Sequence, residues 1–143
     1  MLNIDFVKLK DNYSTDSTSV HRCSINFPNT CAIRMSEAIV KAEPKYLDIF
    51  KAATINKCPH GYIRGAQDLA KVLSSRSALG PRSFGWGAQP SGKRPANATG
   101  KKGIVCFMNI PGFSGQGHID LWNDTVPVGS DYWDSETIWM WKL

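Results

Sequence analysis

Long hydrophobic runs are missing from this chain of 143 residues. No apolar stretch approaches the ~18 residues that a membrane-spanning helix needs. Residues 1–10 also lack the basic start and apolar centre of a signal peptide. We therefore expect a protein that is made in the cytoplasm without a signal peptide and does not contact a membrane.

Long runs of one charge are also missing. The 17 Lys and Arg outnumber the 12 Asp and Glu and give a net charge of +5, yet no basic run exceeds two residues. A mildly basic surface favours anionic partners, but it also fits a charge that serves only solubility. Because aromatic residues do not alternate with the scattered cations, we expect no nucleic-acid partner.

Closely paired cysteines, as in structural zinc sites, are absent as well. The chain has four cysteines, Cys23, Cys31, Cys58 and Cys106. We expect no metal and no cofactor. An even number fits two disulfides, and it equally fits one reactive thiol among three ordinary ones, so spacing alone leaves the pairing open.

The N-terminal half has helical periodicity. Apolar residues at spacings of three and four predict a helix that starts at Asn29 or Thr30 and ends at Glu43, before Pro44. The same reasoning predicts a short helix over residues 46–53 and another over residues 66–73. Residues 5–13 fit either a helix or a strand, residues 14–19 a loop, and residues 58–61 a turn.

The C-terminal half is dominated by strand patterns. Residues 80–102 are rich in Gly, Pro, Ser and Lys, which suggests either a cleft wall or lid, or a surface excursion pinned by Phe84 and Trp86. Residues 104–108, 118–122 and 137–143 read as strands. Helices followed by closely linked strands predict an α+β fold with an antiparallel sheet, in one domain over residues 1–143.

Cys31 lies at the predicted start of a helix. The N-terminus of a helix carries partial positive charge and free N–H groups, which favour a thiolate and can hold an oxyanion. This placement suggests a catalytic nucleophile. A small cysteine packed beneath the helix fits the position equally well.

His118 is predicted at the first position of a strand and follows two glycines. Glycines there let another element approach closely, so the imidazole could reach a helix end and act as a general base. An ordinary hydrogen-bonded histidine is the alternative, and we assign no role to His21 or His60. For the group that orients the imidazole we favour Asp131, in the turn before the last strand, over Asp120, which shares a strand face with His118. Asp124 and Asp134 also lie nearby in the sequence.

Two segments, NTCAIRMSEA over residues 29–38 and GHIDLW over residues 117–122, resemble the fourth family of type VI secretion amidase effectors. The similarity extends to Arg64-Gly65-Ala66, to Leu69-Ala70 and to the final WMWKL. It implies a papain-like fold related to NlpC-type wall peptidases. It further implies hydrolysis of the γ-D-glutamyl–meso-diaminopimelate bond of peptidoglycan stem peptides by Cys31, His118 and an aspartate best matched by Asp131.

The resemblance also implies a bacterial toxin that a secretion apparatus delivers to the periplasm of a rival, and an immunity protein that blocks its cleft. Some members carry a disulfide in the turn before the last strand, whereas residues 124–135 contain no cysteine here. A transferase or deamidase toxin on the same scaffold, or a non-enzymatic basic module that binds the wall, are the alternative functions.

Overall fold

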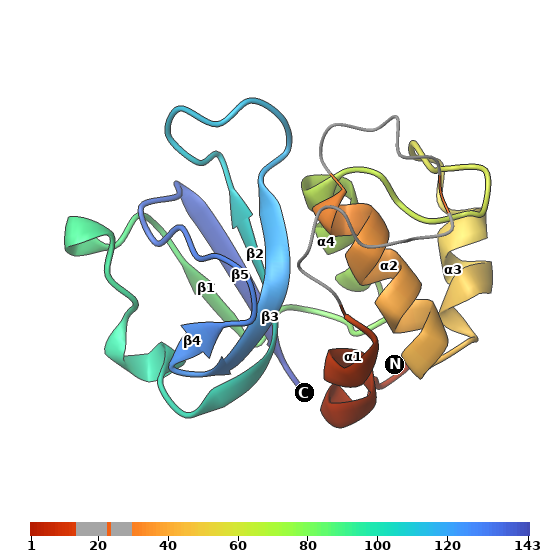
Figure 1. Cartoon of the computed structure of the whole chain (residues 1–143), viewed down its shortest axis with the longest axis horizontal. Coiled ribbons are helices and arrows are strands. Elements are labelled where there is room, and N and C mark those ends of the chain that lie inside the picture. The colour runs from red at the N-terminus through yellow and green to blue at the C-terminus, as the bar shows by residue number, and fades with distance from the viewer. Residues whose placement is uncertain (14–22, 24–29) are drawn as a thin grey trace.

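The computed structural model describes residues 1–13, 23 and 30–143. Its helices gather on one side of a sheet (Figure 1). They are α1 (Phe6–Asn12), α2 (Cys31–Ala42), α3 (Tyr46–Ala52) and α4 (Ala66–Leu73). No helix within the described residues is long and apolar enough to cross a membrane. The loop expected over residues 14–19 lies outside the described residues.

The sheet has five antiparallel strands in the order β1-β5-β2-β3-β4. They are β1 (Phe84–Trp86), β2 (Lys101–Met108), β3 (His118–Asp124), β4 (Val126–Pro127) and β5 (Thr137–Lys142). The predicted combination of helices with an antiparallel sheet is therefore confirmed. The strands β1 and β4 were not predicted, because two- and three-residue strands carry no periodicity of their own.

Local sequence explains the ends of the helices. Asp5 caps α1 by accepting a hydrogen bond from Lys8 N at 3.1 Å, which decides residues 5–13 in favour of a helix. The helix α2 ends at Ala42 with Glu43 as its C-cap, as expected for a residue before a proline. Its buried face includes Met35 and Ile39, which is the apolar face that the spacing predicts.

The main hydrophobic core lies between the helices and one face of the sheet. Side chains from α2 and α4 pack there against alternate residues of β2 and β3, namely Ile104 and Cys106, and Ile119 and Leu121. Alternate residues of a strand point to opposite faces. The side chains of His118, Asp120 and Trp122 therefore belong to the other face of β3.

Residues 80–102 cover that other face, so they are more ordered than the expected long loop. They contain β1 and two 3-10 turns, η1 (Pro90–Gly92) and η2 (Ala96–Ala98). Phe84 and Trp86 pack against a second cluster that includes Phe107, Trp122 and Trp133. The indole of Trp122 donates to the Ala98 carbonyl at 2.8 Å. The aromatic residues therefore pin the excursion, and part of it, including Lys93 and Arg94, lines a surface cavity.

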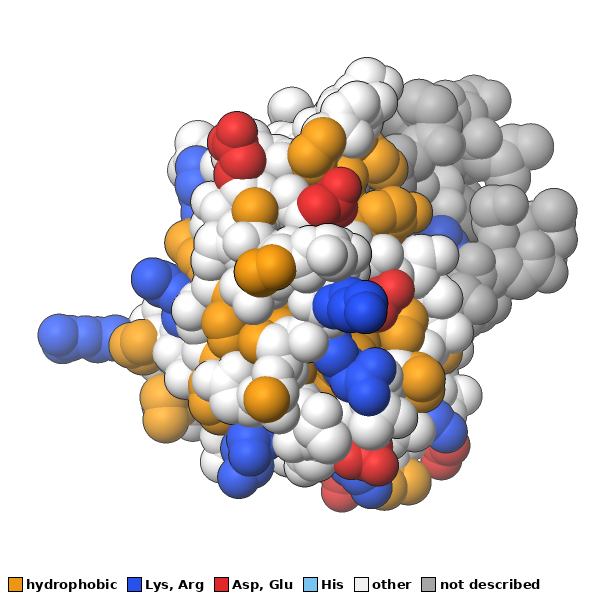
Figure 2. Space-filling model, turned by 90° about the vertical axis from the view of Figure 1, so that its left-hand side faces the viewer, with side chains coloured by type: hydrophobic (Ala, Val, Ile, Leu, Met, Phe, Trp, Pro, Cys, Tyr) orange, Lys and Arg blue, Asp and Glu red, His pale blue; other side chains and the backbone are white. Residues whose placement is uncertain are grey.

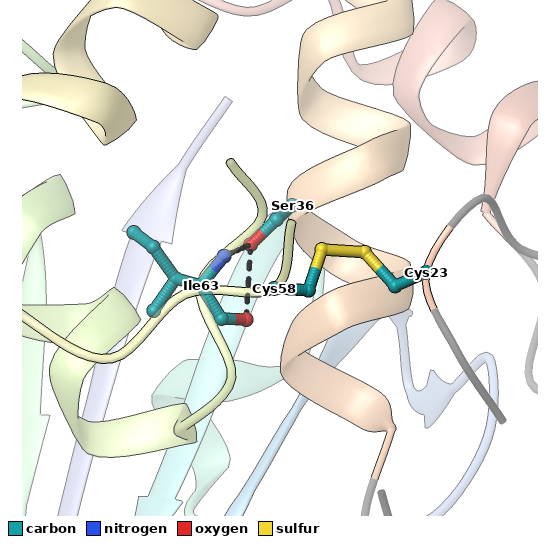
Figure 3. Close-up of a disulfide and its surroundings, with 4 residues drawn as sticks. All are labelled: Cys23, Ser36, Cys58 and Ile63. Carbon is teal, nitrogen blue, oxygen red and sulfur yellow. Dashed lines mark hydrogen bonds between the residues drawn. A yellow bond between two sulfur atoms is a disulfide. The ribbon is translucent and has the colours of Figure 1, made fainter. Parts of the chain in front are cut away.

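A disulfide joins Cys23 to Cys58 beside α2 (Figure 3). Within the same view, the Ser36 hydroxyl of α2 accepts from Ile63 N at 3.2 Å and donates to Ile63 O at 3.5 Å. The Ser36 bonds fasten the segment that follows α3 to the middle of α2, and the disulfide fastens the same segment to Cys23, which precedes α2. Cys31 and Cys106 are buried and do not take part in this disulfide.

Candidate active site

Cys31 is the first residue of α2. The helical ladder begins with the bond from Arg34 N to Thr30 O at 2.8 Å, so the N–H groups before Arg34 precede that ladder. The Arg34 side chain also donates to the Thr30 hydroxyl at 3.1 Å, which braces this first turn. The thiol of Cys31 therefore lies where a helix concentrates partial positive charge. The side chain is only 2% exposed.

His118 is the first residue of β3, and Gly117 makes its position possible. Gly117 has a φ of +111°, and a Cβ at that position would lie 2.0 Å from the Phe107 carbonyl oxygen. Only glycine lets the chain enter β3 this close to β2. The His118 ring stacks near Phe107 and meets Tyr132 edge-on, with ring centroids 6.5 and 5.5 Å apart.

Asp120 holds the imidazole of His118. The His118 Nε2 lies 2.7 Å from the Asp120 Oδ2, and Asp120 is fully buried. The two residues are neighbours on one face of β3, the arrangement considered for Asp120 from the sequence. Because Nε2 is engaged by the carboxylate, Nδ1 is the ring nitrogen left to face the Cys31 thiol.

Asp131 does not occupy that position, so the preference for Asp131 is corrected in favour of Asp120 as the partner of His118. The Asp131 Oδ2 accepts a hydrogen bond from the Trp133 indole at 3.0 Å. It borders a surface cavity together with Lys93 and Arg94. The physical reason is that strand periodicity fixes Asp120 beside His118, whereas the turn directs the Asp131 carboxylate elsewhere.

The turn before β5 is held without a disulfide. The Asp120 carboxylate accepts hydrogen bonds from Gly129 N at 3.1 Å and Ser130 N at 2.9 Å, and also from Leu121 N at 2.7 Å. The same buried carboxylate thus orients His118 and fastens the turn that carries Tyr132. Further along the turn, the Ser135 hydroxyl donates to the Tyr132 carbonyl.

The surroundings of His118 favour its charged form. Burial lowers the pKa, but hydrogen bonds to Asp120 and Cys31, together with the negative charges of both groups, outweigh it and raise the pKa from 6.5 to about 9. The imidazole is therefore protonated at neutral pH. An imidazolium beside a cysteine at a helix N-terminus is the setting of a nucleophile that is paired with a proton carrier.

The other cysteines and histidines lack such a setting. Cys106 is fully buried, its thiol donates to the Ala66 carbonyl at 3.6 Å, and burial together with the charge of Cys31 raises its pKa well above the usual range. A protonated buried thiol is a poor nucleophile. Cys23 and Cys58 are joined to each other. His60 is exposed, and His21 lies outside the described residues.

Three residues around the site were not singled out from the sequence. The Tyr13 hydroxyl donates to the Ile119 carbonyl, between His118 and Asp120, at 3.3 Å. Burial and the charges of Asp120 and Cys31 raise the pKa of Tyr13 well above its usual range. Tyr132 packs on the imidazole, and Gln116 accepts from Asp68 N at 2.9 Å, which ties the segment before β3 to α4. Only long-range contacts reveal these roles.

Within residues 1–13, 23 and 30–143, no group of three or more His, Cys, Asp or Glu side chains is placed to hold a metal ion. The arrangement of thiol, imidazole and carboxylate is that of a nucleophile, a proton carrier and an orienting group. Such a set is suited to acyl transfer.

Comparison with solved structures shows a shared fold. The chain aligns with the type VI effector–immunity complex Tae4–Tai4 from Salmonella Typhimurium, with a TM-score of 0.65 and 22% identity over 82% of this chain and 75% of that chain. The corresponding complex from Enterobacter cloacae gives 0.61 and 19% over 82% and 76%. The type VI effector Tae4 from Enterobacter cloacae gives 0.59 and 20% over 82% and 74%. No curated protein matches the chain.

A family model also matches most of the chain. The model described as type VI secretion system (T6SS), amidase effector protein 4 matches residues 27–141. This range contains Cys31, His118 and Asp120 and leaves out α1 and Tyr13. The chain therefore belongs to the family of type VI secretion amidase effector protein 4.

Proposed function

We propose that the chain is a peptidoglycan amidase that hydrolyses the γ-D-glutamyl–meso-diaminopimelate bond of stem peptides, with Cys31 as nucleophile, His118 as proton carrier and Asp120 as orienting group. The observation that carries the proposal is the position of His118, which contacts the Asp120 carboxylate and the Cys31 thiol. Membership of an amidase effector family supports amide hydrolysis. The papain-like and NlpC-type relationship belongs to the same proposal.

The first half of the reaction forms a thioester. The Cys31 proton resides on His118, and the Cys31 thiolate attacks the amide carbonyl, whose oxygen becomes an oxyanion. N–H groups of the first turn of α2 stabilise that oxyanion. His118 then gives its proton to the leaving amine, the C–N bond breaks, and the acyl group stays on sulfur.

The second half regenerates the enzyme. His118, now neutral, takes a proton from water, and the resulting hydroxide attacks the thioester carbonyl. The C–S bond breaks, the acid leaves, and Cys31 returns as a thiolate beside the imidazolium. Asp120 keeps the imidazole in one orientation throughout, because three backbone N–H groups hold its carboxylate in place.

The biological setting is part of the proposal. We propose that the protein is made in the bacterial cytoplasm, delivered by a type VI secretion apparatus to the periplasm of target bacteria, and toxic there. The structural relatives described as effector–immunity complexes support a cognate immunity protein that covers the site. Nucleic acid, membrane, metal and cofactor have no role in this mechanism.

The test uses purified meso-diaminopimelate muropeptides and product masses. Wild-type protein is expected to release a fragment ending in D-glutamate and a fragment beginning with diaminopimelate, and Cys31→Ala is expected to release neither. Cys106→Ala is the matched control, because it removes a buried thiol that the reaction does not use. Intact but deamidated stems, or products joined to an added amine, would show a deamidase or transferase instead. Inert wild-type protein that still binds the wall would indicate a binding module.

A further inference from the structure

The positive charge of the chain is concentrated in one part of the sequence. Between Asp68 and Asp120 there is no Asp or Glu, although the rest of the chain contains all 12. The same stretch carries seven of the 17 basic residues, namely Lys71, Arg76, Arg82, Lys93, Arg94, Lys101 and Lys102. This stretch alone therefore accounts for the net positive charge of the molecule.

Part of this charge lies beside aromatic rings on the face of the sheet away from the helices. The Lys101 ammonium lies 5.8 Å from the Phe84 ring centroid. The Phe84 and Trp86 rings are parallel, with centroids 5.6 Å apart, and Trp86 meets Trp133 edge-on at 5.4 Å. Phe84 and Trp86 are half-buried, so part of each ring reaches the surface.

Trp133, the last of these rings, borders a surface cavity of about 570 Å³. Lys93, Arg94, Asp131 and Trp133 are among the residues that line it. Lys93 and Arg94 are exposed, and neither forms a salt bridge with any described residue. The turn before them holds Ser91 at a φ of +57°, a strained conformation for a residue with a side chain. Two cations thus follow directly after a tight turn and line the same cavity.

Figure 2 faces the side of the molecule where β1, β4, η1 and η2 lie in Figure 1. It shows Lys and Arg side chains among hydrophobic ones, with some Asp and Glu side chains on the same face. We name the set formed by Phe84, Trp86, Lys93, Arg94 and Lys101 the basic–aromatic strip. The Trp86 indole donates to the Asn97 side chain at 3.1 Å. This bond holds the ring of Trp86, which lies at the centre of the basic–aromatic strip.

The strip is connected to the catalytic residues through Trp133. Trp133 packs edge-on against Phe107 at 5.2 Å, and Phe107 is the ring next to His118. Gln89 N donates to the Trp133 carbonyl at 2.7 Å, which ties the turn of Lys93 and Arg94 to the segment after Asp120. The strip therefore has a fixed position relative to His118, from which the rings of Phe107 and Trp133 separate it.

We propose that the basic–aromatic strip is a second binding surface for the wall polymer, which holds a glycan strand and its stem peptides while another stem of the same polymer occupies the active site. This inference rests on the proposed function. Apolar faces of sugar rings suit the aromatic rings, and stem carboxylates suit the cations. Because both surfaces engage one polymer, binding at the strip raises the effective concentration of stems at Cys31.

The test compares an insoluble polymer with a small fragment of it. In the Cys31→Ala background, Lys93→Ala/Arg94→Ala is expected to reduce co-sedimentation with purified sacculi about ten-fold, since two surface contacts are lost. With Cys31 restored, the same pair is expected to lower kcat/KM on sacculi by a similar factor and to leave hydrolysis of soluble muropeptides within about two-fold. Lys8→Ala/Lys10→Ala removes the same charge from exposed positions of α1 and is expected to change neither.

Three results would overturn the proposal. Unchanged sedimentation of the Lys93/Arg94 variant would show that the strip does not bind the wall. An equal loss on sacculi and on soluble muropeptides would place these residues in the active site. Binding of a single-stranded oligonucleotide as tightly as sacculi would indicate a general site for polyanions. The sedimentation is measured with the inactive Cys31→Ala protein. Its result therefore tests the strip even if the amidase proposal fails.

Discussion

Asp120 contributes two functions through one buried carboxylate. One of its oxygens contacts His118. The carboxylate also accepts hydrogen bonds from the backbone N–H groups of the turn over residues 129–130. A buried carboxylate is costly unless such partners satisfy it, and here four partners surround it. The orientation of the imidazole and the conformation of the turn are therefore coupled at a single residue.

Asp120→Asn is expected to lower kcat by about 10²- to 10⁴-fold, because an amide cannot stabilise the imidazolium in the same way. Asp131→Asn is the control and is expected to retain activity within about three-fold, since Asp131 bonds to Trp133 and not to His118. Single-turnover rates on muropeptides measure both. The reverse ranking of the two variants would restore Asp131 as the orienting residue.

The raised pKa of His118 predicts a stability that depends on pH. The folded pKa of about 9 exceeds the unfolded value of 6.5. The contribution of His118 to the free energy of unfolding is therefore fully present below pH 6.5 and is lost as pH rises through 9. Between pH 6 and pH 9.5, the free energy of unfolding of the wild type is expected to fall by about 2 to 3 kcal/mol more than that of His118→Ala.

Urea unfolding at the two pH values measures this difference. His60→Ala, at an exposed position, is the matched control and is expected to behave like the wild type. If the free energies of unfolding of the wild type and His118→Ala changed equally with pH, the imidazole would not be held as a cation.

At the scale of elements, the junction of β2 and β3 decides where His118 lies. The chain leaves β2 at Met108, turns through residues 109–117 and enters β3 at His118, which pairs with Phe107. Gln116 anchors the end of this connection to α4 through Asp68, with bonds of 2.9 and 3.0 Å. The close approach at Gly117 completes the alignment.

Gly117→Ala is expected to destabilise the fold by about 3 kcal/mol or more and to abolish activity, because its Cβ would overlap the Phe107 carbonyl. Gly112→Ala in the same connection is the control. Its φ is also positive, at +75°, but a Cβ at this position would meet nothing within 4 Å. A loss of about 1 kcal/mol in the free energy of unfolding is therefore expected. Thermal unfolding compares the two, and equal costs would contradict the close approach.

At the scale of the whole molecule, the two faces of the sheet have different coverings. One face packs against the helices, and the other against aromatic residues and short turns from residues 80–102. The disulfide adds a long-range link on the helical side, with its cysteines 35 residues apart in the sequence. Such a link constrains the unfolded chain over the whole segment that contains Cys31.

Reduction of the Cys23–Cys58 bond is expected to lower the free energy of unfolding by about 3 to 4 kcal/mol, as estimated for a loop of this length. Urea unfolding with and without a thiol reductant measures the loss. Cys23→Ser/Cys58→Ser serves as the control, since reductant should not alter its stability. A wild-type midpoint that is insensitive to reductant would argue that the bond adds no stability.

The sequence by itself determined the features that local patterns encode. Helical spacing marked α2 with Cys31 at its start, and strand alternation with preceding glycines marked β3 with His118 at its start. Alternation also showed that Asp120 shares a face with His118. These features depend on backbone geometry within a few residues, so the chain specifies them without reference to the rest of the fold.

Only the tertiary structure decided which of the possible partners meet. It joined Cys23 to Cys58, brought Tyr13 to Ile119, placed Asp120 rather than Asp131 against His118, and formed β1 and β4 by pairing. Each of these choices depends on elements distant in sequence or on the path of a turn. No local periodicity records such contacts, because their energy arises from packing and hydrogen bonds that exist only after the chain has folded.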